Sequence, residues 1–366
     1  MPKLLASILA ISFCAPAASL FAQSQPAPAT PPQITTAVTV LNKDGKFVPN
    51  LTKGDFTLTD DGHPTAIASF TQASTDPLTM GILVQTSAGQ SDSLGSERAA
   101  AGVFLDHMIV PPQHRAFLIQ FGGEVDLLSD VSADKAHLHK ALVETGTPQM
   151  HNTSADQSDN GGARLDSGGS ALYDAIYLAS TEVMKKQQPR KVLIVLSDGV
   201  DRGSKTSLFS AIEAAQRANT AVYAIYIKGE DEKAQRKNSG GYPGQRRGGP
   251  GWPGGGYPGT GPGWPGGSGG GGNPNPSRPT EGSRMDGRKI LAQICRETGG
   301  YLYESGKKNS LDNIFSTLAG ELQSKYMIGF TPTTKQEGGY HRLVITPKNS
   351  DLTVQARQGY YSGNED

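Results

Sequence analysis

Short, wholly apolar runs separated by amphipathic helical stretches constrain the fold of this chain most. Residues 82–84, 117–119 and 192–196 are apolar at every position, and residues 222–227 nearly so. Such runs are typical of strands buried on both faces, as in parallel sheets covered by helices. Between them, apolar residues recur at helical spacing, for example Ala100, Phe104 and Met108. The sequence therefore predicts an α/β domain with a doubly wound, mostly parallel sheet.

Two flanking segments have the alternating pattern of antiparallel strands. In residues 35–75, positions 37–40 and 56–59 alternate and are separated by turn sequences, which predicts a small N-terminal β module with one face packed and one in water. The α/β domain is expected over 78–330. Residues 331–366 then supply a C-terminal β-hairpin, formed by 341–346 and 352–355, and a tail.

A Gly/Pro-rich stretch interrupts the predicted α/β domain at residues 231–284. It contains repeated Tyr-Pro-Gly, Trp-Pro-Gly and Gly-Gly units. A segment of this composition buries too little apolar surface to offset the conformational entropy that ordering would cost. We therefore predict a disordered loop here.

The N-terminus has the pattern of an export signal, and we assign it residues 1–22. Lys3 precedes an apolar core over residues 4–13, and mostly small residues follow up to Ala22. The core is much shorter than the ~20 apolar residues of a membrane span. A Pro/Ala-rich spacer follows at 23–34, and no later segment is apolar enough to span a membrane. We expect an exported protein, periplasmic or secreted, in which cleavage removes Cys14 and leaves Cys295 as a single thiol without an internal disulfide.

Charge and motif content argue against several function classes. The chain has 34 basic and 34 acidic residues, so it lacks the basic excess of a nucleic-acid-binding protein. Residues 266–270 match the nucleophile-elbow pattern only in composition, without the strand and helix that the motif needs. No pair of nucleophile and base can be named from the sequence, which predicts a protein that is not an enzyme.

Three polar loops in the α/β region resemble those of the von Willebrand factor A (VWA) family. They are residues 85–89 (QTSAG) after the first apolar run, 168–174 (GGSALYD) before a helix, and 196–201 (LSDGVD) after a central run. In the family, the equivalent loops carry Asp-x-Ser-x-Ser, a threonine and Asp-Gly, and form a metal-ion-dependent adhesion site. Residues 45–56 and 357–361 are also similar to those of secreted bacterial VWA-related proteins. The resemblance implies a VWA-like, Rossmann-type sheet with its site at the carboxyl edge.

The loops depart from the family pattern at positions that matter for metal binding. Gln85 stands where the family has Asp, and Gly89 where it has the second Ser. The resemblance leaves Ser87, Ser170 and Asp198 as metal ligands, with Gln85 as a neutral fourth. Hard cations such as Mg²⁺ favour carboxylate oxygens, so we predict a degenerate site with a weakly bound Mg²⁺ or no cofactor.

Ordinary structural roles for the same residues remain open at this point. Ser87 and Ser170 could cap helices, and Asp198 with Gly199 could form only a turn. Asp174 and Asp201 are expected to be solvated or hydrogen-bonded within their loops. For the whole chain we expect a non-enzymatic, adhesion-type module that binds a protein or peptide outside the cytoplasm. The alternative is a structural component of the cell envelope with a vestigial metal site.

Overall fold

We describe the fold from a computed structural model. The structure describes residues 33–72, 76–87, 90–110, 113–146, 169–188, 190–229, 286–333 and 338–363. The predicted signal peptide, nearly all of the spacer and the Gly/Pro-rich stretch 231–284 lie outside these residues. The stretch Gln33–Asp366 forms one compact unit. Within the described part of the chain, no helix is both long and apolar enough to cross a membrane.

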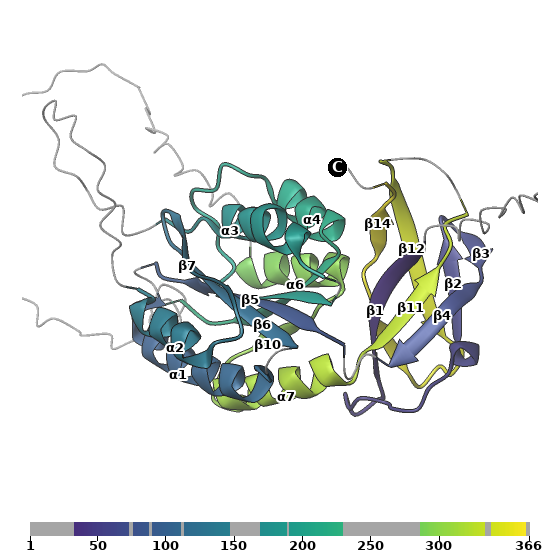
Figure 1. Cartoon of the computed structure of the whole chain (residues 1–366), viewed down its shortest axis with the longest axis horizontal. Coiled ribbons are helices and arrows are strands. Elements are labelled where there is room, and N and C mark those ends of the chain that lie inside the picture. The colour runs from purple at the N-terminus through teal and green to yellow at the C-terminus, as the bar shows by residue number, and fades with distance from the viewer. Residues whose placement is uncertain are drawn as a thin grey trace, which may run out of the picture. The chain divides into compact units, whose positions relative to one another are not determined.

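A six-stranded sheet with the order β10-β9-β8-β5-β6-β7 forms the middle layer of the α/β part, between two sets of helices (Figure 1). Neighbouring strands run parallel except β7, which is antiparallel to β6 at one edge. The three wholly apolar runs lie in β5, β6 and β8, and every residue of β5 is buried. The strands are β5 (Leu78–Gln85), β6 (His114–Phe121), β7 (Val125–Ser132), β8 (Lys191–Ser197), β9 (Thr220–Tyr226) and β10 (Leu302–Glu304).

Helices cover both faces of this sheet. On one face, α1, α2 and α7 share a core with side chains such as Ile82 and Ile194. On the other, α3, α4 and α6 pack on side chains such as Leu83 and Leu193. The doubly wound α/β architecture predicted from the sequence is thereby confirmed. The helices are α1 (Ser91–Met108), α2 (Lys135–Glu144), α3 (Leu172–Leu178), η3 (Ala179–Val183), η4 (Met184–Lys186), α4 (Leu208–Arg217), α6 (Gly287–Thr298) and α7 (Leu311–Gln323).

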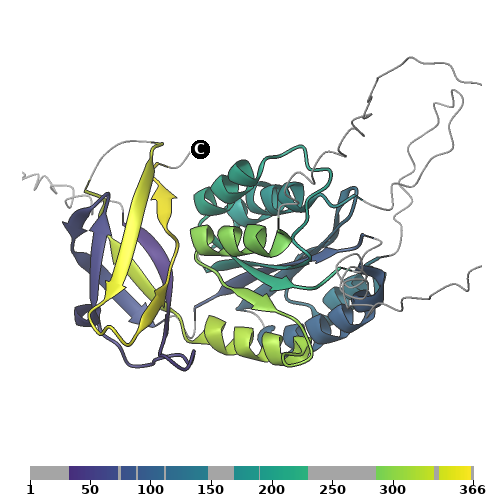
Figure 2. The same cartoon turned by 180° about the vertical axis from the view of Figure 1, so that it is seen from behind.

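Strands from both ends of the chain form two further four-stranded sheets, β13-β1-β11-β4 and β14-β12-β2-β3 (Figure 2). The two sheets enclose one core that includes Val38, Phe56, Phe330 and Leu343, so they form a β-sandwich. Its elements are β1 (Ile34–Leu41), η1 (Lys53–Asp55), β2 (Phe56–Asp60), β3 (His63–Thr65), β4 (Ile67–Gln72), β11 (Tyr326–Phe330), β12 (Tyr340–Pro347), β13 (Thr353–Gln355) and β14 (Gly359–Tyr361).

Two expectations about strand partners need correction. β11 was assigned to the α/β domain, but it pairs with β1 and β4 in the sandwich. The strands over 341–346 and 352–355 were expected to pair with each other. Instead, β12 pairs with β2 and β14, while β13 pairs with β1. Alternation indicates that one face of a strand is buried, but it does not identify partners some 300 positions away.

Candidate functional site at the carboxyl edge of the sheet

The three loops singled out in the sequence lie at the carboxyl edge of the central sheet. β5 ends at Gln85 and its parallel neighbour β8 ends at Ser197, so the loops after them begin side by side. The third loop joins them through the Ser170 carbonyl, which accepts a hydrogen bond from the Arg202 N–H at 2.8 Å. In open α/β sheets, ligands bind at this edge.

The buried Gln85 side chain connects two of these loops. Its Oε1 accepts hydrogen bonds from the Ser197 hydroxyl (2.6 Å) and the Asp198 backbone N–H (3.1 Å), and its Nε2 donates to Ser87 Oγ (2.8 Å). A backbone N–H can only donate, so the amide oxygen must face Asp198 and the amide nitrogen must face Ser87. Both ends of the amide are therefore engaged within the protein.

Asp198 and Gly199 form the tight turn that follows β8. Asp198 Oδ1 accepts a hydrogen bond from the Val200 N–H at 3.0 Å, and Gly199 has a φ of +72°. Burial raises the pKa of the Asp198 carboxyl, although the bond from Val200 acts in the opposite direction. The turn interpretation of these two residues is confirmed.

Ser170 does not cap α3 with its side chain, and Ser87 is not the N-cap of α1. The N-cap of α3 is Ala171 and that of α1 is Gln90, and neither of these makes a side-chain capping bond. The alternative role of Ser170 as a capping side chain is thus wrong, whereas that of Ser87 stays a prediction because residues 88 and 89 lie outside the described part of the chain. Ser170 Oγ is buried and has no hydrogen-bond partner among the described residues. It is the one hydroxyl of the predicted ligand set that has no partner there.

The carboxylates of Asp174 and Asp201 accept hydrogen bonds from loop residues, as expected from the sequence. Asp201 accepts the Ser204 hydroxyl at 2.6 Å, and Asp174 accepts the backbone N–H groups of Lys205 and Thr206 at 2.9 and 2.8 Å. These bonds fix the loop between β8 and α4. Two residues in it, Arg202 and Lys205, have exposed side chains.

The residues that flank the Gly/Pro-rich stretch also lie against the Asp198 turn. A Cβ added to Gly229 would lie 3.0 Å from Asp198 Oδ2. On the other side of the stretch, Gly287 packs so closely on Gly199 that neither position has room for a side chain. The chain therefore leaves the described fold and returns to it beside this turn. Gly89, the second departure from the family pattern, lies outside the described residues.

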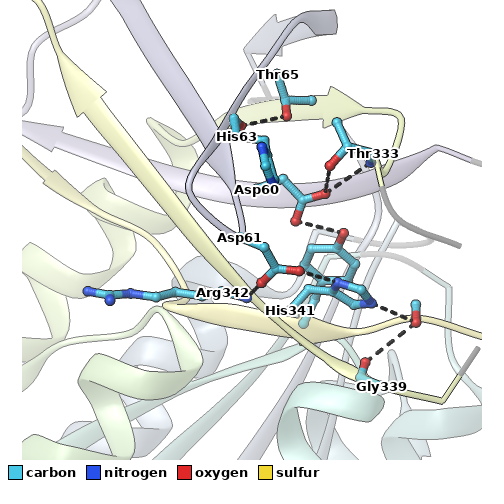
Figure 3. Close-up of polar contacts among 10 residues, drawn as sticks. Asp60, Asp61, His63, Thr65, Thr333, Gly339, His341 and Arg342 are labelled. Atoms are coloured by element: carbon cyan, nitrogen blue, oxygen red, sulfur yellow. Dashed lines mark hydrogen bonds and ion pairs between the residues drawn. The ribbon is translucent and has the colours of Figure 1, made fainter. Parts of the chain in front are cut away.

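A second polar cluster, which the sequence did not reveal, lies in the β-sandwich (Figure 3). Ligand atoms of Asp60, Asp61 and His341 come within 4.8 Å of one another, as a metal site would require. Yet Asp60, fully buried, already accepts hydrogen bonds from the Thr333 N–H, the Thr333 hydroxyl and the Tyr360 hydroxyl. These engaged oxygens fit a structural junction between β2, β14 and the segment after β11 better than a cation site.

His341 joins this cluster to the end of the chain. Its Nδ1 lies 2.7 Å from Asp61 Oδ2, and its Nε2 lies 2.9 Å from Ser362 Oγ. Acid, imidazole and hydroxyl thus follow one another as in serine hydrolases, although no nucleophile–base pair was evident in the sequence. The Ser362 backbone N–H, a natural donor for an oxyanion, is instead bonded to the Gly339 carbonyl at 3.0 Å. The only local signal was the Asp-Asp-Gly turn at 60–62; its partner His341 lies 280 positions away.

The chain is similar to one protein family and, at low identity, to several solved structures. The family model of the von Willebrand factor type A domain matches residues 86–246. No curated protein matches the chain. Among solved structures, an aerotolerance-related membrane protein of Bacteroides fragilis is 13% identical, with 67% of this chain and 98% of that chain covered and a TM-score of 0.41.

Two further solved structures have similar scores. BatB of Bacteroides thetaiotaomicron is 13% identical, with 67% of this chain and 97% of that chain covered and a TM-score of 0.39. Proximal thread matrix protein 1 from the mussel byssus, in a form with a zinc-occupied MIDAS motif, is 12% identical, with 72% and 49% covered and a TM-score of 0.42. The family match and the parallel sheet wound on both faces establish that this chain carries a von Willebrand factor type A domain.

Proposed function

We propose that this chain is a non-enzymatic binding protein that acts outside the cytoplasm. In this proposal the loops at the carboxyl edge of the VWA sheet hold a protein or peptide ligand. VWA domains are commonly protein-interaction modules, which supports a protein partner over a small molecule. The export signal predicted from residues 1–22 supports the location.

The observation that carries the proposal is the Gln85 network. It ties Ser87, Ser197 and Asp198 into one hydrogen-bonded edge. A preformed edge loses little conformational entropy when a partner binds. The loop after β8 also carries the exposed side chains of Arg202 and Lys205, which suit acidic or polar groups of a partner.

The donor set at this edge fits a divalent cation poorly. The oxygen of Gln85 already accepts two hydrogen bonds, and Ser87 Oγ receives the Gln85 amide N–H. Asp198 supplies the one carboxylate of the predicted set, and Ser170 supplies a hydroxyl without a described partner. A hard cation is held by several oxygens, several of them charged. We infer that Mg²⁺ is bound weakly or not at all and that ligand binding does not depend on it.

A second candidate function is that of a structural envelope component whose β-sandwich makes the contacts. It is favoured by the outer face of β12, where the side chains of Tyr340 and Val344 are 48% and 40% exposed. Exposed apolar side chains that lie close together on a surface can mark a protein contact.

The experiment compares two charge reversals in the exported protein. Immobilised wild type, Arg202→Glu at the sheet edge, and Lys46→Glu in the exposed turn after β1 are each used to capture partners from an envelope extract. Binding at the edge predicts loss of the captured partner only with Arg202→Glu, with EDTA having no effect. Loss only with Lys46→Glu would favour the sandwich. Capture by neither variant nor wild type would contradict the proposed function.

A further inference from the structure

A small cavity of about 40 Å³ lies where residues of the sandwich approach the start of β8 and the end of α7. Four of its lining side chains are cationic: Arg190, Lys191, Lys325 and Arg357. None of its lining residues is acidic. Burying like charges together is unfavourable unless an opposite charge compensates them.

Two of these cations have unpartnered groups in the buried wall. Lys325 is 3% exposed, and its Nζ has no hydrogen-bond partner among the described residues. Arg357 is 7% exposed; its Nη2 donates to the Thr35 carbonyl at 3.1 Å, but its Nε is likewise without a partner. Buried ammonium and guanidinium groups are normally paired. These two therefore indicate a missing acceptor.

The nearby carboxylate does not fill this role. Glu321, on α7 one turn before Lys325, uses Oε1 to accept the hydroxyls of Thr39 and Tyr223 and Oε2 to accept that of Tyr303. Lys325 Nζ instead lies 4.8 Å from the centroid of the Tyr223 ring. Glu321 thus offsets part of the positive charge from a distance, without bonding to it.

The remaining two cations keep the wall positive. Arg190 donates to the backbone carbonyls of Asp76 and Leu322, both at 2.6 Å, and the Asp76 carboxylate offsets only part of the effect of burial on its charge. Lys191 is half-buried. Burial lowers the pKa of Lys325 to about 8 and that of Arg357 to about 10, as expected where a positive charge lacks a counter-charge.

We propose that this cavity is a binding site for one small inorganic anion, a halide such as chloride, held by Lys325 Nζ and Arg357 Nε. A single water needs at least roughly 10–15 Å³ of such space. A cavity of about 40 Å³ therefore admits a monatomic ion and excludes a metabolite-sized carboxylate. The anion completes the polar contacts between β11, α7 and the segment before β14, so it acts as a structural counter-ion.

The test is a melting-temperature titration of the full exported chain at constant ionic strength, with sodium chloride or bromide replacing sodium gluconate, which is too large for the cavity. A ligand that binds only the folded state raises stability in a saturable way. We expect both halides to raise the melting temperature, and Lys325→Met to abolish that rise. The matched control Lys307→Met, at an exposed lysine, keeps it.

A second readout does not depend on a variant that folds. In crystals grown with bromide, an anomalous peak within hydrogen-bond distance of Lys325 Nζ and Arg357 Nε would support the proposal. Water alone at that position would overturn it. A melting temperature that is the same in halide and in gluconate would also overturn it. The same holds for a halide effect that Lys325→Met leaves unchanged. In gluconate, Lys325→Met should equal or exceed wild type in stability, because it removes an uncompensated buried charge.

Discussion

The side-chain oxygen of Gln85 accepts a hydrogen bond from the Asp198 backbone N–H at 3.1 Å, across the adjacent ends of β5 and β8. An aspartate at position 85 could accept the same bond but could not donate to Ser87. It would also place a second carboxylate beside that of Asp198. Gln85 thus joins the two loops without the charge that would call for a cation.

We predict that the unmodified protein binds Mg²⁺ or Mn²⁺ with a dissociation constant no tighter than about millimolar. At free metal equal to that constant, the stabilisation is only ~0.4 kcal/mol. The pair Gln85→Asp and Gly89→Ser restores one charge and one hydroxyl. It should tighten binding at least about tenfold and raise the melting temperature only when metal is present. Calorimetric titration measures both proteins.

Asp198→Ala in the restored background serves as the control and should cancel the gain, because Asp198 supplies the remaining carboxylate of the set. Micromolar Mg²⁺ binding by the unmodified protein, lost in Ser87→Ala, would contradict a degenerate site. It would make this a working metal-dependent domain.

We predict that cleavage of the expected signal leaves one thiol, and that this thiol is inert in the folded state. Cys295 is 2% exposed, and burial raises the pKa of its thiol well above the usual range, so the reactive thiolate is scarce. We expect an intact mass that starts between residues 18 and 25, no labelling by a thiol reagent under native conditions, and one label after denaturation. Two labels after denaturation would show that Cys14 is retained.

Asp60→Ala should destabilise the sandwich by about 3 kcal/mol. The change leaves the Thr333 N–H and the Tyr360 hydroxyl without their buried acceptor, at roughly 1–3 kcal/mol for each such group. Urea unfolding gives the value. Asp351→Ala is the matched control, since its salt bridge with Lys43 is largely exposed and should be worth less than about 1 kcal/mol. Equal effects of the two changes would show that the Asp60 junction is not important for stability.

Ser362 should not react with a fluorophosphonate probe, despite its place in line with His341 and Asp61. Stabilising the negative charge that develops on the probe oxygen in the transition state needs free donors, and the Ser362 N–H is bonded to the Gly339 carbonyl. Mass spectrometry of the probe-treated protein tests this. Labelling at Ser362 that disappears in His341→Gln would overturn the non-enzymatic proposal.

Local sequence patterns were sufficient to predict the buried strands of the α/β domain. The apolar run at 192–196 predicts a strand buried on both faces because it alternates with helical segments, and it is β8 in the middle of the sheet. The Asp198-Gly199 turn was also evident, because Gly after Asp at a strand end is a turn signal. The observed φ of Gly199 agrees with it.

Contacts between residues far apart in the sequence could not be predicted from these local patterns. The sequence did not show that β1 pairs with β11, that His341 meets Asp61, or that Lys325 and Arg357 line one cavity. Each depends on residues tens to hundreds of positions apart, which only the folded chain brings together. Side-chain direction was equally hidden: Ser170 looked like a capping residue, yet α3 begins one position later, with Ala171 as its N-cap.

Glu97 on α1 is 1% exposed and has no hydrogen-bond partner for either carboxylate oxygen in the described structure. The nearby Ser93 hydroxyl donates to Gln90 instead. Burial therefore raises the pKa of Glu97 to about 7. The folded state then holds a proton that the unfolded state releases above about pH 4.3.

Because this folded pKa is raised, Glu97 costs almost nothing at pH 4, where the folded state is protonated and the unfolded state mostly so. Its cost grows from about pH 4.3 to pH 7 and is constant above, at roughly 3.7 kcal/mol. Glu97→Gln should thus match wild type at pH 4 and exceed it by up to that amount at pH 8 in urea unfolding. Glu124→Gln, at an exposed position in the β6–β7 turn, should stay within about 0.5 kcal/mol of wild type at both pH values. An equal difference between Glu97→Gln and wild type at pH 4 and pH 8 would mean that Glu97 is ionised in the folded protein, with a partner to match its charge.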